Sequence, residues 1–165
     1  MIDFVKGQIY CYHKLCSGIP KIPKMLESGM LVGIGTDGAS SNNNLDMHEE
    51  MKLTSLLTKV SSGAEKLPAE EALKMASSNV AIAYGIPAGV IAEGFFADAL
   101  LVDLKNERLN PSHNLVSNWV YSADSSSIHS VICNGSFVMK NHHIDGEDDI
   151  VREARLCAKD IASRC

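Results

Sequence analysis

The stretch Met30-Leu31-Val32-Gly33-Ile34-Gly35-Thr36-Asp37-Gly38 decides how the rest of the sequence is interpreted. Residues 30–36 form a mostly apolar run of strand length that contains glycines. A run without alternation is typical of a strand buried on both faces, as in a parallel sheet. Residues 21–28 before it predict a short helix that stops at Gly29. A helix followed directly by such a strand is an αβ unit, so we expect an α/β fold.

Asp37 directly follows this strand. The carboxyl ends of parallel strands are where α/β folds place catalytic groups, because the loops at that edge converge on one site. A carboxylate there can bind a metal ion and carry protons to and from a metal-bound water. The alternative is that Asp37-Gly38 only forms a turn. The polar tract over residues 40–44 favours a functional role, because so long a polar run beside a buried strand is unusual in a simple turn.

Beyond residue 44 the pattern is first helical and then rich in β-structure. The residue pattern predicts αβ units up to about residue 86, followed by a small β-rich segment and a final helix. Asn134-Gly135 is a strong hairpin signal between two strands. A strand is expected near Phe4, Val5, Ile9 and Tyr10, and further strands over residues 89–91, 97–104, 128–133 and 137–139. Helices are expected over residues 45–59, 115–121 and 148–164. Another helix should run from Pro68 to the break at residues 77–79, and a short one from that break to Gly85.

Composition excludes several functional classes. The 165 residues carry 15 basic and 20 acidic side chains, for a net charge of -5. That balance gives no electrostatic footprint for nucleic acid or for an anionic membrane surface. The longest apolar runs are shorter than the roughly 20 residues that a membrane span needs, and the first residues lack a signal-peptide pattern. We therefore expect a cytoplasmic protein with no nucleic-acid partner and no membrane partner.

The cysteines and histidines are expected to be structural or surface residues. The five cysteines are odd in number and lack a CxxC pair, which is typical of reduced thiols. They are Cys11, Cys16, Cys133, Cys157 and Cys165. Of the six histidines, we expect His48 to face solvent, His113 to lie in a loop, and His129, His142 and His143 to belong to the β-rich part, with none acting as a metal ligand.

Residues 35–47, GTDGASSNNNLDM, followed by Glu49-Glu50-Met51, resemble the last barrel-strand motif of the metal-dependent amidohydrolases. Within that family they are most similar to the 5-methylthioadenosine/S-adenosylhomocysteine deaminases and their chlorohydrolase-like relatives. The similarity extends in register from about residue 14 to residue 160. It includes residues 14–20, 25–29, 71–76, 97–104, 120–123 and 131–135.

The resemblance implies a fold, a reaction and a role for one residue. The fold would be the C-terminal part of a TIM-like (β/α)8 amidohydrolase barrel plus part of a small composite β-sandwich. Residues 1–86 would be the partial barrel, 87–146 the partial sandwich and 147–165 a C-terminal helix. The reaction would be hydrolytic deamination of an adenine-type nucleoside, of the S-adenosylhomocysteine or methylthioadenosine class, with a divalent metal, usually zinc. Asp37 would be a metal ligand and catalytic proton carrier. The resemblance names no substrate-binding residue in this chain.

Departures from the family pattern also carry expectations. The family's His-x-His pair, its later histidine ligand and its glutamate belong to an N-terminal part that has no counterpart here, and His13 lies off register. A catalytic zinc site usually needs three protein ligands, so we expect the chain to be a fragment that is inactive alone. A missing N-terminal half or a homo-oligomer would complete it. The alternatives are a non-catalytic self-associating or binding module and, more weakly, a phosphate loop over residues 33–38, which lacks the P-loop lysine.

Overall fold

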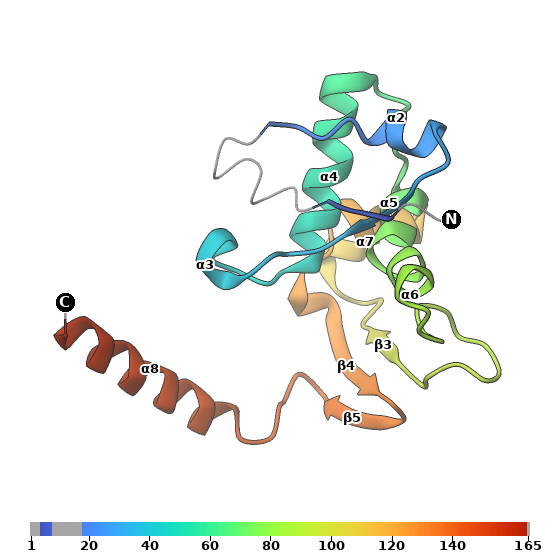
Figure 1. Cartoon of the computed structure of the whole chain (residues 1–165). Helices are drawn as coiled ribbons and strands as arrows, with labels where there is room; N and C mark the ends of the chain where they lie inside the picture. Colours follow the sequence, from blue (N-terminus) through green and yellow to red (C-terminus); the bar gives the residue numbers. More distant parts are fainter. Residues whose placement is uncertain (1–3, 8–17, 165) are drawn as a thin grey trace.

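The computed structural model describes residues 4–7 and 18–164 (Figure 1). Of the residues named above, Ile9, Tyr10, Cys11, His13, residues 14–17 and Cys165 lie outside these ranges. The elements are β1 (Phe4–Gly7), α2 (Ile22–Glu27), β2 (Leu31–Ile34), α3 (Ala39–Asn42), α4 (Met47–Ser62), α5 (Ala69–Ala76), α6 (Ser78–Tyr84), β3 (Ala99–Val102), the 3-10 turn η1 (Glu107–Leu109), α7 (Leu115–Tyr121), the 3-10 turn η2 (Ser125–Ser127), β4 (Ile128–Cys133), β5 (Ser136–Met139) and α8 (Glu147–Ser163).

Strand β2 is the buried strand that the sequence predicts. It pairs in parallel with β1, in a register that places Phe4 beside Leu31 and Gly7 beside Ile34. Val32 and Ile34 are almost fully buried, and α2, α5 and α6 pack against the strand. The prediction of a parallel-type strand behind a short helix is therefore confirmed.

Helix α4 joins the core to the segment that follows β2. Met51 on its buried face belongs to the same apolar cluster as β2. The Ser55 hydroxyl donates to the Leu67 carbonyl at 2.7 Å and lies 2.7 Å from the Tyr121 hydroxyl of α7. One side chain of α4 therefore contacts both the loop before α5 and helix α7, which holds these elements against α4.

The second sheet is antiparallel, with strand order β3-β4-β5. Ala99 pairs with Ile132, and Cys133 pairs with Ser136. The turn residues Asn134 and Gly135 both have positive φ, 48° and 80°. Two consecutive left-handed residues match the right-handed twist of a two-strand hairpin, so the Asn-Gly prediction is confirmed.

Helix α8 forms over nearly the predicted range but none of its residues is buried. Figure 1 shows it extending away from the two sheets. Within residues 4–7 and 18–164, no helix has both the length and the apolar character that crossing a membrane requires.

The strand predicted over residues 89–91 is wrong. Gly89 and Val90 form a bend, and Ile91 has no regular secondary structure. Gly89 has φ +80°, and a Cβ there would lie 2.8 Å from the Cα of Ser78. The backbone therefore turns tightly over the start of α6, a contact that hydrophobic pattern alone does not reveal.

Gly89→Ala tests this close approach. We expect it to lower the free energy of unfolding by about 1–2 kcal/mol from the left-handed backbone and by about 1–3 kcal/mol more from the clash. Gly94→Ala is the matched control, because Gly94 has φ +81° and no atom lies within 4 Å of the place that a methyl group would take. Urea unfolding measures the free energy of unfolding of both variants, and an equal decrease in the two would contradict the prediction.

Candidate functional site

Asp37 lies just beyond the carboxyl end of β2, where the sequence places the candidate catalytic carboxylate. Its φ is +63°, in the left-handed region that residues with a Cβ rarely adopt. The Ser41 hydroxyl donates to its Oδ2 at 2.8 Å. Ser41 belongs to α3, the single helical turn that the polar tract forms. The carboxylate is thus half-buried and is oriented by a residue of its own loop.

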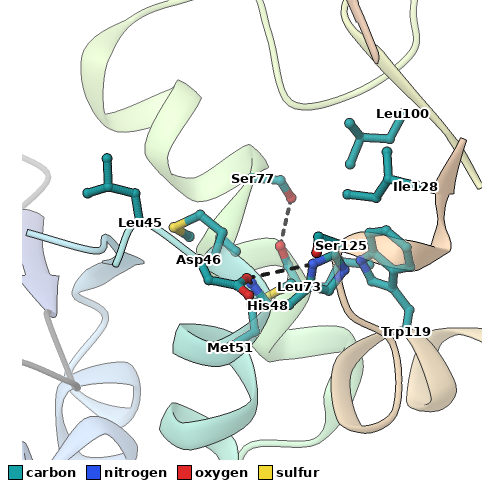
Figure 2. Close-up of a pocket in the computed structure, with 12 residues that line it drawn as sticks. Leu45, Asp46, His48, Met51, Leu73, Ser77, Leu100, Trp119, Ser125 and Ile128 are labelled. Carbon is teal, nitrogen blue, oxygen red and sulfur yellow. Dashed lines mark hydrogen bonds and ion pairs between the residues drawn. The ribbon is translucent and has the colours of Figure 1, made fainter. Parts of the chain in front are cut away.

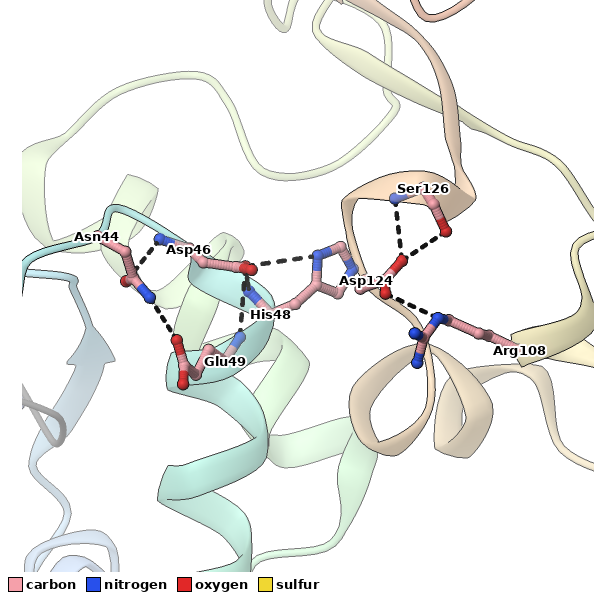
Figure 3. A network of polar contacts seen from close by, with 7 residues as sticks. All are labelled: Asn44, Asp46, His48, Glu49, Arg108, Asp124 and Ser126. Atoms are coloured by element: carbon pink, nitrogen blue, oxygen red, sulfur yellow. Dashed lines mark hydrogen bonds and ion pairs between the residues drawn. The ribbon is translucent and has the colours of Figure 1, made fainter.

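The start of α4 follows directly and is held by a side-chain cap. Asp46 Oδ1 accepts from the backbone N–H of His48 at 2.8 Å and of Glu49 at 3.4 Å. Asn44 donates to the Glu49 carboxylate, which closes the same turn (Figure 3). Capping by Asp46 explains why α4 begins at Met47 rather than at residue 45.

The expectation that His48 faces solvent is wrong, because only 8% of its surface is exposed. Its ring meets Trp119 of α7 edge to face, with 4.1 Å between centroids, and its Nδ1 lies 3.9 Å from Asp46 Oδ1. Trp119 is remote in sequence, so hydrophobic spacing along α4 carries no signal for this contact.

Figure 3 shows the His48 ring pointing from α4 toward Asp124. Asp124 is held by Ser126, whose hydroxyl donates to Oδ1 at 2.6 Å, and by Arg108, whose Nε lies 2.7 Å from Oδ2. The hydrogen bond from Ser126 lowers the pKa of Asp124, and Arg108 lowers it further. A negative charge therefore persists on the segment that His48 faces.

Burial lowers the pKa of His48 below its ordinary value of 6.5, although the Asp46 and Asp124 carboxylates act in the opposite direction. The buried Nε2 has no hydrogen-bond partner among residues 4–7 and 18–164. The neutral imidazole is thus the form that the folded chain favours.

His48 and Trp119 also line a cavity of about 720 Å³ between α4 and the antiparallel sheet (Figure 2). Most of its other lining is apolar and comes from α4, α5 and the sheet. These lining residues include Met51, Leu73, Leu100 and Ile128.

The other described histidines lie in the loop and in the β-rich part where the sequence predicts them. His113 is exposed before α7, and His129 on β4 stacks edge to face on His142 at 5.4 Å. Cys133 and Cys157 are exposed free thiols.

In the part of the chain that the structure describes, no three His, Cys, Asp or Glu side chains come together to hold a metal ion. The chemistry of Asp37 fits one zinc ligand, and the described residues do not supply the others.

Comparison with known proteins decides the family. The profile of the amidohydrolase family matches residues 11–138. The chain belongs to the amidohydrolase family. It is 44% identical over 156 residues to a 5-methylthioadenosine/S-adenosylhomocysteine deaminase of Syntrophomonas wolfei, covering 92% of this chain and 36% of that protein. It is 43% identical over 151 residues to a 5'-deoxyadenosine deaminase of Methanosphaera stadtmanae, with 90% and 36% covered.

Solved structures agree with the fold of this amidohydrolase chain. A zinc-bound adenosine deaminase from Xanthomonas campestris superimposes with a TM-score of 0.91 at 28% identity, over 97% of this chain and 38% of that one. An atrazine chlorohydrolase from Arthrobacter aurescens complexed with zinc gives a TM-score of 0.80 at 26% identity, over 93% and 35%. The predicted α/β amidohydrolase fold is confirmed, and the chain spans about 36% of the length of the curated relatives it matches.

The buried neutral His48 predicts a pH dependence of stability. Below a pH of about 6.5 the unfolded chain binds a proton at this imidazole before the folded chain does. The free energy of unfolding should therefore fall as the pH drops through 6.5 toward the lower folded-state pKa.

His48→Gln should flatten this fall between pH 7 and pH 5, as urea unfolding at several pH values would measure. His113→Gln changes an exposed histidine and should leave the slope of the parent chain unchanged. Equal slopes in the parent and His48→Gln would show that His48 does not cause the dependence.

Proposed function

We propose that this chain is the aspartate-bearing part of a zinc-dependent amidohydrolase that hydrolytically deaminates adenine-type nucleosides. The observation that carries the proposal is the Asp37 carboxylate, set beyond the end of a buried parallel strand and oriented by Ser41. The names of the similar deaminases favour a substrate of the S-adenosylhomocysteine, methylthioadenosine or 5'-deoxyadenosine class.

In this proposal the Asp37 carboxylate would be one of the groups that hold the metal ion. A zinc ion, when bound, supplies Lewis-acid activation of the water that attacks the ring carbon bearing the amine. In this role the Asp37 carboxylate would accept a proton from that water and pass it to the amino group, which would leave as ammonia. Water thus replaces the amine by an oxygen, and ammonia leaves.

We further propose that this chain alone is inactive and works with the barrel part that its longer relatives carry. One carboxylate does not bind zinc tightly, because catalytic zinc sites use three protein ligands. The exposed free thiols Cys133 and Cys157 favour a reducing compartment, so we place the protein in the cytoplasm.

Self-association without catalysis is a second candidate function. Leu100, Leu101, Phe137 and Val138 are each close to half exposed on the antiparallel sheet. Helix α8 adds further exposed apolar side chains, because none of its residues is buried. Large exposed apolar patches are typical of surfaces that contact another protein, and self-association would cover side chains such as these.

Asp37→Asn tests the ligand assignment. The chain should be co-expressed with the N-terminal part of the Syntrophomonas wolfei relative. Deamination of S-adenosylhomocysteine is then measured from the change in the ultraviolet absorbance of the purine ring. Loss of a metal ligand should reduce activity at least about 100-fold. Asp145→Asn, an exposed carboxylate in the loop before α8, should leave activity unchanged. Activity in Asp37→Asn within tenfold of the parent complex would overturn the assignment.

Experiments on the 165-residue chain alone distinguish the two candidate functions. We expect no deamination and no stoichiometric zinc after dialysis, because the other ligands are not supplied. Sedimentation velocity at micromolar concentration would show a stable oligomer if self-association is the function. Tight equimolar zinc together with turnover would contradict the claim that the chain is inactive alone.

A further inference from the structure

A buried amide links the residue before Asp37 to helix α4. Asn42 Nδ2 donates to the Thr36 carbonyl at 2.6 Å and to Glu50 Oε1 at 2.8 Å. Asn42 is 0% exposed and Glu50 is 1% exposed. Both of these partners are oxygens, so the two hydrogens of one amide nitrogen bridge two otherwise separate segments.

The Thr36 carbonyl belongs to the same peptide plane as the Asp37 nitrogen. Because that plane is rigid, a hydrogen bond that fixes the Thr36 oxygen also fixes the direction from which the chain enters Asp37. The left-handed φ of Asp37 is unfavourable for a residue with a Cβ, and such a conformation persists only where its surroundings hold it.

Two adjacent residues of α3 hold Asp37 at different points. The Ser41 hydroxyl contacts the carboxylate of Asp37, and the Asn42 amide contacts the backbone before it. Glu50 then anchors the amide to α4. A buried carboxylate is costly without hydrogen bonds, so the contact with Asn42 also stabilises Glu50.

We propose that Asn42 and Glu50 are positioning residues, which hold Asp37 in one backbone conformation and one side-chain rotamer. The relevance of this to catalysis rests on the proposed function, in which Asp37 binds the metal.

The test measures Asp37 directly by NMR on the isotope-labelled chain without metal. Three-bond couplings report its φ and its χ1. Asn42→Ala removes both hydrogen bonds, so the couplings should move to averaged values. Amide exchange at Ser41 and Asn42, whose N–H groups donate to Gly38, should accelerate roughly fivefold for each hydrogen bond lost.

Two further comparisons separate positioning from general destabilisation. Glu50→Ala should average the Asp37 couplings, whereas Glu50→Gln keeps an acceptor oxygen and should restore them. Glu49→Gln alters a neighbouring carboxylate of α4 that contacts Asn44 instead, and it should leave Asp37 unchanged. If Asn42→Ala fails to fold, the comparison of Glu50→Ala with Glu50→Gln decides the matter.

Unchanged Asp37 couplings in a folded Asn42→Ala or Glu50→Ala chain would overturn the positioning role. Failure of the proposed function gives a different result. In that case the couplings still respond to Asn42 and Glu50, while Asp37→Asn leaves deamination in the co-expressed complex intact.

Discussion

The burial of strand β2 is the constraint on which the rest of the structure depends. Val32 and Ile34 lie in the main apolar cluster, and the Asn79 amide of α6 donates to the Val32 carbonyl at 2.9 Å. A strand packed on this scale can hold the residues just beyond its end in a fixed direction. That is why Asp37, a half-buried carboxylate with an unfavourable φ, can occupy a defined place at the edge of the core.

Helix α4 connects this region to other parts of the chain through side-chain contacts. Its buried face is unusually polar, because Glu50 contacts the Asn42 amide and Ser55 contacts both Leu67 and the Tyr121 hydroxyl. Its first turn places His48 against Trp119. Buried polar groups demand partners of defined geometry, so they specify one arrangement of neighbouring elements more strictly than apolar packing alone.

Local pattern was enough to predict part of this structure. The apolar run of β2, the hairpin at Asn134 and the candidate carboxylate Asp37 are all visible without tertiary information. The burial of His48 and Glu50 has no such local signal, because each depends on a partner in another element. The strand predicted at Gly89 is wrong for the same reason, since the backbone of Ser78 excludes a Cβ there. The division of the chain at residue 86 stays a prediction.

If the proposed function holds, the geometry around Asp37 would affect how its metal site forms. The hydrogen bonds that link Asp37 and its preceding peptide to Ser41, Asn42 and Glu50 all lie within residues 36–50. These contacts connect residues that are close together in the sequence. A ligand that is already in position loses less conformational entropy when an ion binds, so in the proposed site the other ligands would meet a fixed carboxylate. Hydrogen bonds between neighbours in the sequence would thus shape the proposed ligand before the complete site is assembled.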